Sequence, residues 1–349
     1  MDHDGDSPIV SRGKDVTPLP RTRSRRGRVI DFAAILAEAP SFLQTALGGE
    51  PPEVTSLHSG VSSANFLVSH STGLYVLRLE AFREMADIEL DIAVIEACRQ
   101  AGVSVIPSPI MLEEWNGFPT LLRPYVEGMT LKEARALDAA SVRAAGRELG
   151  RIHATPQHPN REWFYERAVT EPGGIRSSGL DAAPAARHAI MRLQPKMQEL
   201  FDAGRGLVHS DFKADNLVLS QDRIVVLDWE KATAGPQLFD LALAVFHLLA
   251  VEDRKIASIG ARAFVAGYLG ENPPGGEFLA DLPSAVLYSA SIFYLIDLEI
   301  ASRTVRARDP STIDLRHLLY YRSYCLPAYS RLIERSSWVA RALNIGSAP

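Results

Sequence analysis

The sequence predicts an α+β protein of two lobes, in which a small antiparallel sheet with one helix precedes a larger, mainly helical lobe. Alternating apolar residues recur between residues 54 and 126, whereas helical periodicity dominates from residue 139 onward. Between the two parts, Pro124 and Gly128 bracket a short extended segment. A chain of 349 residues also exceeds the size at which one core usually stops growing. We therefore expect a basic, disordered tail over residues 1–30, a first lobe over 31–123 and a second lobe over 124–349.

The first lobe is predicted to contain five strands and one inserted helix. Apolar alternation bounded by turn residues marks the strands, which are expected at residues 54–60, 64–70, 74–80, 103–111 and 119–126. The last two are expected to be joined by a turn at Glu113–Gly117. Ile88–Ala101 has a helical apolar face and is closed by Gly102. Asp31–Leu47 is predicted to form one or two short helices ahead of the sheet.

The second lobe is predicted to be helical around a few short strands. Helices are expected at residues 131–136, 139–153, 182–203 and from Phe239 onward, with breaks at 272–276 and 308–311. Short strands are expected at residues 206–208, 217–219 and 224–227. The polar, Pro- and Gly-rich stretch 155–181 is expected to form an irregular insert over the cleft between the lobes.

Composition favours an ordinary globular protein of the cytoplasm. Apolar residues make up 46% and charged residues 23% of the chain. The longest nearly apolar stretch, Leu241–Val251, is about half a membrane span, so no transmembrane helix is expected. Cys98 and Cys325 have no metal-binding spacing. Residues 1–28 carry a net charge of +3, which leaves about −8 on the rest of a chain whose total is −5. This acidic body makes nucleic acid an unlikely partner. Nothing in the sequence indicates an oligomeric state.

The stretch 207–240, LVHSDFKADNLVLSQDRIVVLDWEKATAGPQLFD, carries the strongest functional pattern. Asp211 and Asn216 lie on a tight loop between apolar strands, and Asp228 follows the next strand. Asp211 could accept the proton of a substrate hydroxyl, while Asn216 and Asp228 could share an Mg²⁺ that bridges nucleotide phosphates. Phosphoryl transfer requires mainly an oriented nucleophile, a base and neutralised phosphate charge. The spacing therefore predicts a phosphotransferase.

These motifs resemble those of the aminoglycoside phosphotransferase and choline kinase group, whose members share the protein-kinase-like fold. Ser210 stands where that group usually has Gly in His-Gly-Asp-x4-Asn. The resemblance implies that Asp211 is the catalytic base and that Asn216 and Asp228 are metal ligands. It further implies that Asp240 buttresses the loop and that His209 orients it, with a role as catalytic acid less favoured. The expected cofactors are ATP, or alternatively GTP, and Mg²⁺.

The nucleotide side of the cleft is assigned by position in this fold. Arg78, whose side chain alternates with those of Leu77 and Leu79, occupies the strand position of the phosphate-clamping Lys. A guanidinium can hold two phosphate oxygens at once. Asp91 is expected to orient Arg78, with Glu89 as the competing candidate. The preceding turn is expected to contact phosphate through Gly60, Ser62, Ser63 and Asn65. Backbone groups of the hinge are expected to meet adenine, namely those of Arg123, Tyr125 and Val126.

On the acceptor side, several residues have two possible roles. Asp297 and Glu299 could offer anionic contacts to an amine-bearing acceptor, although a solvated helix face would explain them as well. The aromatic residues 163–165 could stack on a ring, but the more frequent use of such a cluster is to anchor an insert to the core. His153 and His247 are expected to be packed, hydrogen-bonded residues rather than ligands.

Three functional classes remain to be separated. The leading hypothesis is a kinase that phosphorylates a hydroxyl of a small molecule: either an antibiotic, as in an aminoglycoside-type antibiotic-resistance enzyme, or a metabolite of the choline or homoserine type. A non-catalytic nucleotide-binding regulator is an alternative, which the presence of all three of Asp211, Asn216 and Asp228 disfavours. A protein kinase is disfavoured because the chain lacks His-Arg-Asp, Asp-Phe-Gly and Ala-Pro-Glu motifs.

Overall fold

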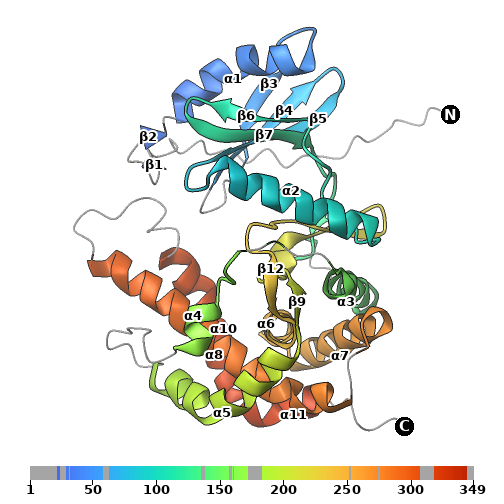
Figure 1. Cartoon of the computed structure of the whole chain (residues 1–349), viewed down its shortest axis with the longest axis vertical. Coiled ribbons are helices and arrows are strands. Elements are labelled where there is room, and N and C mark those ends of the chain that lie inside the picture. The colour runs from blue at the N-terminus through green and yellow to red at the C-terminus, as the bar shows by residue number, and fades with distance from the viewer. Residues whose placement is uncertain are drawn as a thin grey trace, which may run out of the picture.

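The computed structural model describes most of the chain as two lobes stacked along its long axis (Figure 1). The described residues are 22–23, 29–30, 32–57, 63–134, 138–156, 159, 161–171, 183–250, 253–273, 276–306 and 318–343. Most of the expected N-terminal tail lies outside these residues. Within it, β1 (Thr22–Arg23) and β2 (Val29–Ile30) pair in antiparallel fashion.

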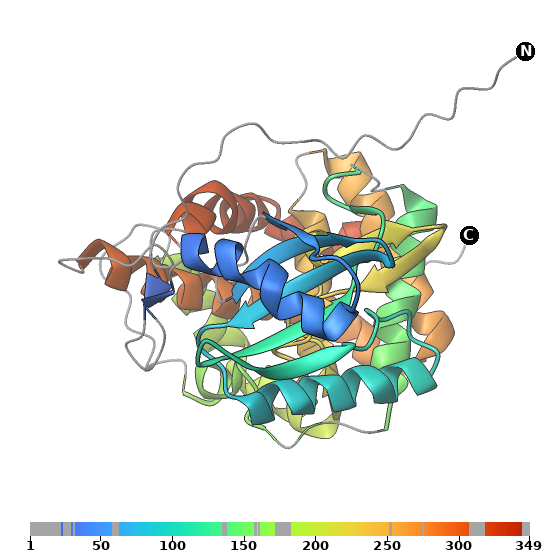
Figure 2. The same ribbon diagram turned by 90° about the horizontal axis from the view of Figure 1, so that it is seen from above.

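The first lobe is built on a five-stranded antiparallel sheet in the order β3-β4-β5-β7-β6. Its strands are β3 (Glu53–Ser56), β4 (Ser63–His70), β5 (Gly73–Glu80), β6 (Met111–Trp115) and β7 (Phe118–Pro124). One sheet face packs against a single helix, α1 (Phe32–Leu47), which lies across the sheet in Figure 2. Leu77 and Leu79 are fully buried on that face together with Leu43 of α1. The alternation predicted for β5 is therefore confirmed, since Arg78 is directed to the opposite face.

The second helix of this lobe, α2 (Met85–Gln100), lies on the side of the sheet toward the other lobe (Figure 1). It begins at a reciprocal capping arrangement between Glu84 and Asp87. Gly102 follows it with a φ of 83°, in agreement with the expected glycine stop. Ile95 and Cys98 of α2 belong to the core cluster that continues into the second lobe.

The strand predicted at residues 103–111 is wrong. Strand β6 begins at Met111, so the segment expected to form a turn at Glu113–Gly117 is largely strand. Pro107 and Pro109 lack the N–H groups that a sheet interior requires, and only an isolated bridge from Val105 to Val226 forms there. The hairpin turns at Asn116 and Gly117, whose φ angles of 52° and 77° suit a two-residue Asn-Gly turn.

The hinge leads into two small sheets that frame the predicted catalytic loop. β8 (Met129–Thr130) adds to the hairpin of β10 (Leu217–Ser220) and β11 (Arg223–Val226), in the order β11-β10-β8. β9 (Arg205–Val208) pairs with β12 (Thr233–Pro236) as a separate sheet. Gly128 has a φ of 143° and lies against the backbone of Leu219, where a Cβ would collide. The loop of interest therefore connects two sheets instead of two neighbouring strands.

Helices make up most of the remaining second lobe (Figure 1). Their bounds are α3 (Ala139–Ala154), α4 (Glu166–Thr170), α5 (Ala183–Ala203), α6 (Gln237–Leu249), α7 (Arg254–Glu271), α8 (Gly276–Arg306), the π-helix η3 (Tyr321–Cys325), α10 (Leu326–Glu334) and α11 (Ser336–Leu343). Residues 131–134 form a turn where a helix was expected, and residues 135–136 lie outside the described part. The expected break at 272–276 separates α7 from α8. The expected break at 308–311 lies outside the described residues.

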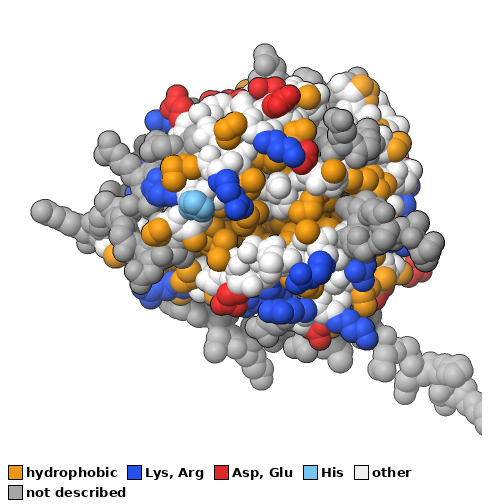
Figure 3. Space-filling model, turned by 90° about the horizontal axis from the view of Figure 1, so that it is seen from below, with side chains coloured by type: hydrophobic (Ala, Val, Ile, Leu, Met, Phe, Trp, Pro, Cys, Tyr) orange, Lys and Arg blue, Asp and Glu red, His pale blue; other side chains and the backbone are white. Residues whose placement is uncertain are grey.

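One described helix, α8, is long and apolar enough over Leu279–Val305 to cross a membrane by length and composition alone. It is instead mostly buried inside the lobe, where it packs against α5 and α6. Leu295 and Leu298 of α8, for example, are fully buried. On the face of the lobe opposite the sheet, apolar side chains are interspersed with basic and acidic ones (Figure 3). Burial against protein thus accounts for the apolar character of α8.

Candidate active site

A buried aspartate at the start of α6 holds the predicted catalytic loop. Asp240 is 1% exposed and accepts hydrogen bonds from the backbone N–H groups of His209 at 2.7 Å and Ser210 at 2.9 Å. It also accepts one from Nε2 of His153 at 3.1 Å, while Nδ1 of His153 lies 2.9 Å from the Tyr268 hydroxyl. The expectations for Asp240 as a buttress and for His153 as a packed, hydrogen-bonded residue are therefore consistent with the structure. The loop's position is determined by α6 and α3.

His209 positions the loop and does not reach the cleft. It is fully buried, and its Nε2–H donates to the carbonyl of Leu227 at 2.9 Å. Its Nδ1 lies 3.3 Å from the backbone N–H of Asp211, from which it accepts. Burial lowers the pKa of His209, so the ring is neutral with the proton on Nε2. A catalytic acid role for His209 is therefore wrong, because both ring nitrogens are committed to backbone groups.

Ser210 explains why a glycine suits this place in the loop. Its φ is 65°, in the left-handed region that residues with a Cβ disfavour. Its hydroxyl accepts a hydrogen bond from Nε1 of Trp163 at 3.1 Å. Trp163 comes from the segment before α4 and is 3% exposed. The backbone strain at Ser210 is therefore offset in part by the buried hydrogen bond from Trp163.

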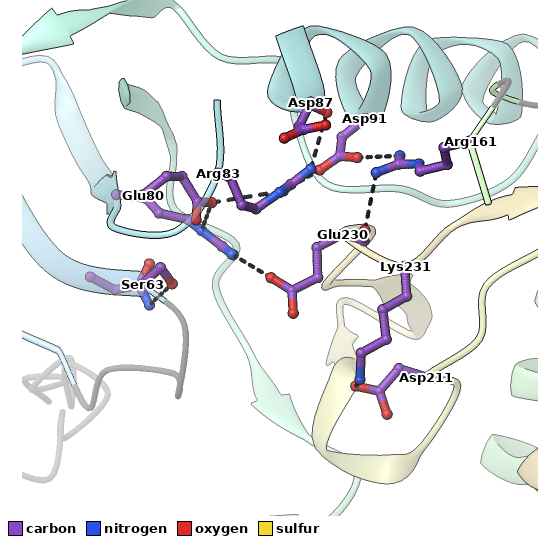
Figure 4. Close-up of polar contacts among 11 residues, drawn as sticks. Ser63, Glu80, Arg83, Asp87, Asp91, Arg161, Asp211, Glu230 and Lys231 are labelled. Carbon is purple, nitrogen blue, oxygen red and sulfur yellow. Dashed lines mark hydrogen bonds and ion pairs between the residues drawn. The ribbon is translucent and has the colours of Figure 1, made fainter. Parts of the chain in front are cut away.

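The carboxylate of Asp211 lies between two ammonium groups. Nζ of Lys213 is 2.8 Å from Oδ1. Nζ of Lys231 is 3.5 Å from Oδ2, and Figure 4 shows Lys231 directed at Asp211. Burial by itself would raise the pKa of Asp211, but Lys231 and Lys213 outweigh it and lower the pKa well below its usual range. Asp211 is therefore ionised at neutral pH, and the three side chains form a compact charged group on the loop.

Asn216 and Asp228 are brought next to this group by backbone contacts. The Asn216 amide donates to the Asp211 carbonyl at 2.9 Å, which leaves its side-chain oxygen available as an acceptor. The N–H of Leu227 donates to the Asn216 carbonyl at 2.9 Å and so fixes Asp228, whose φ is 60°. Among the described residues no ion pair engages the Asp228 carboxylate. Burial, Glu230 and Asp211 raise its pKa to about 6. A carboxylate and an amide oxygen beside excess negative charge fit the oxygen ligands that Mg²⁺ prefers.

The expected partner of Arg78 is wrong. Nε of Arg78 donates to Glu80 at 2.6 Å and Nη2 to Glu230 at 3.3 Å. Asp91 instead accepts from Arg83 at 2.6 Å and pairs with Arg161 (Figure 4), while Glu89 is exposed on α2. Residues 78 and 80 share one face of β5, so Glu80 is the nearest carboxylate. Arg78 nevertheless lines a small cavity of about 30 Å³ together with Asp228, so it does face the cleft.

The other expected nucleotide contacts are partly in place. Asn65 lies opposite Arg78 in the register of β4 and β5, and Ser63 lies opposite Glu80. Gly60 and Ser62 lie outside the described residues. In the hinge, the N–H of Tyr125 donates to the Leu74 carbonyl at 2.9 Å, so this amide is not available to a base as expected. The other two residues expected to contact adenine lie in different places. Arg123 belongs to β7 and pairs in register with Val76, whereas Val126 follows the strand.

On the acceptor side, Asp297 lies near the charged group of Asp211, Lys213 and Lys231, whereas Glu299 does not. The thiol of Cys325 donates to Asp297 at 3.4 Å, and burial raises the pKa of Asp297 to about 6. Glu299 pairs with Arg303 one helical turn further on. In the aromatic cluster, Trp163 and Tyr165 are buried. They anchor the segment to the core, which is the role expected more often of such a cluster. Phe164 is 50% exposed, and Nζ of Lys231 lies 4.9 Å from its ring centre.

Sequence reasoning did not single out Lys213, Lys231 or Glu230. All three lie within three residues of a predicted functional residue: Lys213 follows Asp211 by two positions, and Glu230 and Lys231 follow Asp228 by two and three. This proximity in sequence indicated that the three charges share the site. Spacing alone did not indicate which carboxylate each basic side chain contacts.

The fold and the site together define a phosphotransferase of the protein-kinase-like class. A five-stranded lobe carrying an inward-facing Arg is stacked on a helical lobe that holds an Asp, an Asn and a second Asp at the cleft. A model of the phosphotransferase enzyme family matches residues 53–279. The chain belongs to this family and is a small-molecule kinase, a phosphotransferase that uses a hydroxyl acceptor.

Named relatives and solved structures agree with this class. The homoserine kinase of Methylobacillus flagellatus is 24% identical over 304 residues, which cover 80% of this chain and 92% of that protein. The homoserine kinase of Pseudomonas aeruginosa is 24% identical over 287 residues, covering 77% and 89%.

Among solved structures, an amicoumacin kinase bound to AMP-PNP, Ca²⁺ and amicoumacin superposes with a TM-score of 0.63 at 20% identity, covering 85% of this chain and 93% of that one. A spectinomycin phosphotransferase bound to ADP and spectinomycin gives 0.61 at 15% identity, covering 88% and 97%. A choline/ethanolamine kinase family protein from Mesorhizobium loti gives 0.60 at 16% identity, covering 89% and 99%. At these identities the structures establish the fold.

Proposed function

We propose that this kinase transfers the γ-phosphoryl group of ATP to a hydroxyl of a small molecule at Asp211, with Mg²⁺ as the metal. The observation that carries the proposal is the Asp211 carboxylate held on a buttressed loop beside Lys213 and Lys231, next to Asn216 and Asp228. The nucleotide complexes of the structural neighbours support ATP, and GTP is retained as an alternative donor. Two buried free thiols, Cys98 and Cys325, support a reducing, cytoplasmic location.

The two lysines determine how Asp211 acts. A carboxylate whose pKa lies well below its usual range is a weak base in the resting site, so it serves first to orient the acceptor hydroxyl. In a loose transition state the hydroxyl proton becomes acidic late, and Asp211 accepts it then. Lys213 and Lys231 lie close enough to Asp211 to neutralise charge on the transferring phosphoryl group.

The residues that would hold the metal are the Asn216 side-chain oxygen and the Asp228 carboxylate. When bound, Mg²⁺ neutralises and orients the phosphate oxygens of the nucleotide. Arg78 contributes a further positive charge from the first lobe, where it lines the same small cavity as Asp228. Its guanidinium is held by Glu80 and Glu230 and is thereby aimed at the phosphate region.

The acceptor is proposed to be either an antibiotic or a metabolite. The antibiotic class is supported by the structural neighbours, which carry amicoumacin and spectinomycin. The metabolite class is supported by the homoserine kinases, since the alignment covers most of both chains. A non-catalytic nucleotide-binding regulator is a second candidate for the same site, and turnover distinguishes it.

The experiment is an ADP-release assay on purified protein with ATP and Mg²⁺ against homoserine, choline, ethanolamine, kanamycin and spectinomycin. Acceptor-dependent ADP release is expected for at least one compound, and Asp211→Asn should lower it by about 10²–10⁴-fold. Asp228→Ala should weaken binding of Mg-nucleotide, measured by calorimetry. Glu299→Gln, which alters a carboxylate in an exposed ion pair, is the matched control and should behave as wild type. Nucleotide binding without turnover on any acceptor would favour the regulator.

A further inference from the structure

A second, larger cavity lies beneath the catalytic loop and has apolar walls. Its volume is about 250 Å³, and it is lined by residues of α3, α6, α7 and η3, of the 131–134 turn and of β10, together with the loop itself. Val142 and Ala145 come from α3, Ala244 and Leu248 from α6, and Phe264 from α7. An apolar cavity of about 150 Å³ is sufficient to bind benzene. This space therefore suits a ring with a short substituent.

The cavity adjoins the reacting group. Phe212 and Lys213 line it, and Nζ of Lys213 is 2.8 Å from the Asp211 carboxylate. A molecule that fills the cavity therefore contacts the side chain that touches Asp211. Among the described residues of the lining, Asp215 is the only carboxylate, and it already pairs with Lys132 at 2.6 Å. Such a lining offers no uncompensated negative charge to a polycationic acceptor.

A buried histidine in the lining has one ring nitrogen without a hydrogen-bond partner among the described residues. His247 lines the cavity and is 9% exposed, and its Nδ1 lies 2.5 Å from the Tyr324 hydroxyl. Burial lowers the pKa of His247 to about 3, so the ring is neutral. We assign the Tyr324 hydroxyl as the donor to Nδ1, an assignment that places the ring proton on Nε2. That Nε2–H is buried without a hydrogen-bond partner among the same residues.

We infer that this cavity is the subsite for an apolar portion of the acceptor, with one oxygen of the acceptor receiving the hydrogen bond of His247 Nε2. The inference rests on the proposed kinase function and narrows its acceptor class. The acceptor is an uncharged or weakly charged alcohol that carries an aromatic or branched aliphatic group. Its reacting hydroxyl extends past Lys213 to Asp211. Neither compact homoserine nor a polycationic aminoglycoside fills such a subsite well.

The test compares 2-phenylethanol and 2-(4-methoxyphenyl)ethanol with homoserine and kanamycin, in ADP release and in calorimetric binding. Ala244→Leu fills the cavity from α6, and it should raise the KM for 2-phenylethanol by about tenfold or more while leaving the KM for ATP unchanged. Ala266→Leu makes the same change on the exposed face of α7 and is the matched control. It should not alter either constant.

A second variant examines the polar group without filling the cavity. His247→Phe combined with Tyr324→Phe removes both partners of the buried pair, so no donor remains unsatisfied and the fold should be retained. The wild type should bind the methoxy compound about three- to tenfold more tightly than 2-phenylethanol, because the ether oxygen can accept from Nε2–H. The double variant should lose this preference while it still binds 2-phenylethanol.

The outcomes separate this inference from the function on which it rests. Turnover of homoserine or kanamycin that exceeds turnover of both apolar alcohols, with constants unaffected by Ala244→Leu, would overturn the subsite and leave the kinase intact. Absence of calorimetric binding of both alcohols to the wild type would also overturn it. ADP release that no compound in either panel stimulates would refute the kinase function itself, whatever binds in the cavity.

Discussion

Replacing Asp240 with Ala should damage both the stability and the turnover of the enzyme. The substitution removes the acceptor of three hydrogen bonds, from the N–H groups of His209 and Ser210 and from His153 Nε2. All three donors would remain buried, since Asp240 is 1% exposed and His153 and Ser210 are nearly as well covered. The change therefore leaves three donors without an acceptor in a site that water does not reach readily.

The expected loss of unfolding free energy follows from the cost of burying donors that have no acceptor. Each buried donor left unsatisfied costs about 1–3 kcal/mol. Losses within one network are not additive, and single substitutions rarely exceed about 5 kcal/mol, so the expected loss of unfolding free energy is about 3–5 kcal/mol. Asp253→Ala is the matched control, because Asp253 also accepts from two backbone N–H groups, at 2.8 and 3.0 Å, but is exposed. Its loss should be about 1 kcal/mol.

Urea unfolding followed by circular dichroism measures both variants. Turnover of Asp240→Ala should fall by about 10²-fold, since a shift of roughly 1 Å in the loop misplaces Asp211, while nucleotide affinity changes little. Equal unfolding midpoints for Asp240→Ala and Asp253→Ala would refute the argument that burial sets the cost. Full activity in Asp240→Ala would show that the loop holds its position without the buttress.

Three further predictions concern other residues of the site. Ser210→Gly should change the unfolding free energy of the wild type little, because relief of the strain at a φ of 65° offsets the lost hydrogen bond from Trp163. In a Trp163→Phe background, where that bond is already absent, the same change should stabilise the protein by about 1 kcal/mol. Equal effects in both backgrounds would contradict this. Arg78→Ala should raise the KM for ATP and lower turnover, with partial recovery in Arg78→Lys, and unchanged kinetics would remove Arg78 from the nucleotide site. Asp297→Asn should stabilise the protein by up to about 3 kcal/mol at pH 8, because the folded pKa of Asp297 is raised to about 6 and ionisation there costs stability. The gain should diminish as pH falls from about 6 to 4 and vanish below that range, and a pH-independent gain measured by urea unfolding would refute this cause.

Much of the fold followed from local patterns. The alternation of residues 74–80 predicted β5 and the direction of Arg78 toward the cleft, opposite to Leu77 and Leu79, and Gly102 predicted the end of α2. Where local signals conflicted, the prediction was wrong. Apolar residues in 103–111 suggested a strand, but two prolines in the middle of the segment remove N–H groups that a ladder needs, and the Asn116–Gly117 turn placed the hairpin further along.

The chain's own sequence determined the chemistry of the loop, because Asp211, Asn216 and Asp228 lie on adjoining short elements whose spacing constrains them. Only the tertiary structure decided the partners of the charged groups. Arg78 reaches Glu230 across 152 positions, Arg161 pairs with Asp91 across 70, and His247 meets Tyr324 across 77. Such choices depend on how the lobes and helices pack, because a long charged side chain takes the nearest carboxylate in space. The apolar cavity has the same origin, since its walls come from several helices, a turn, a strand and a loop that no local pattern brings together.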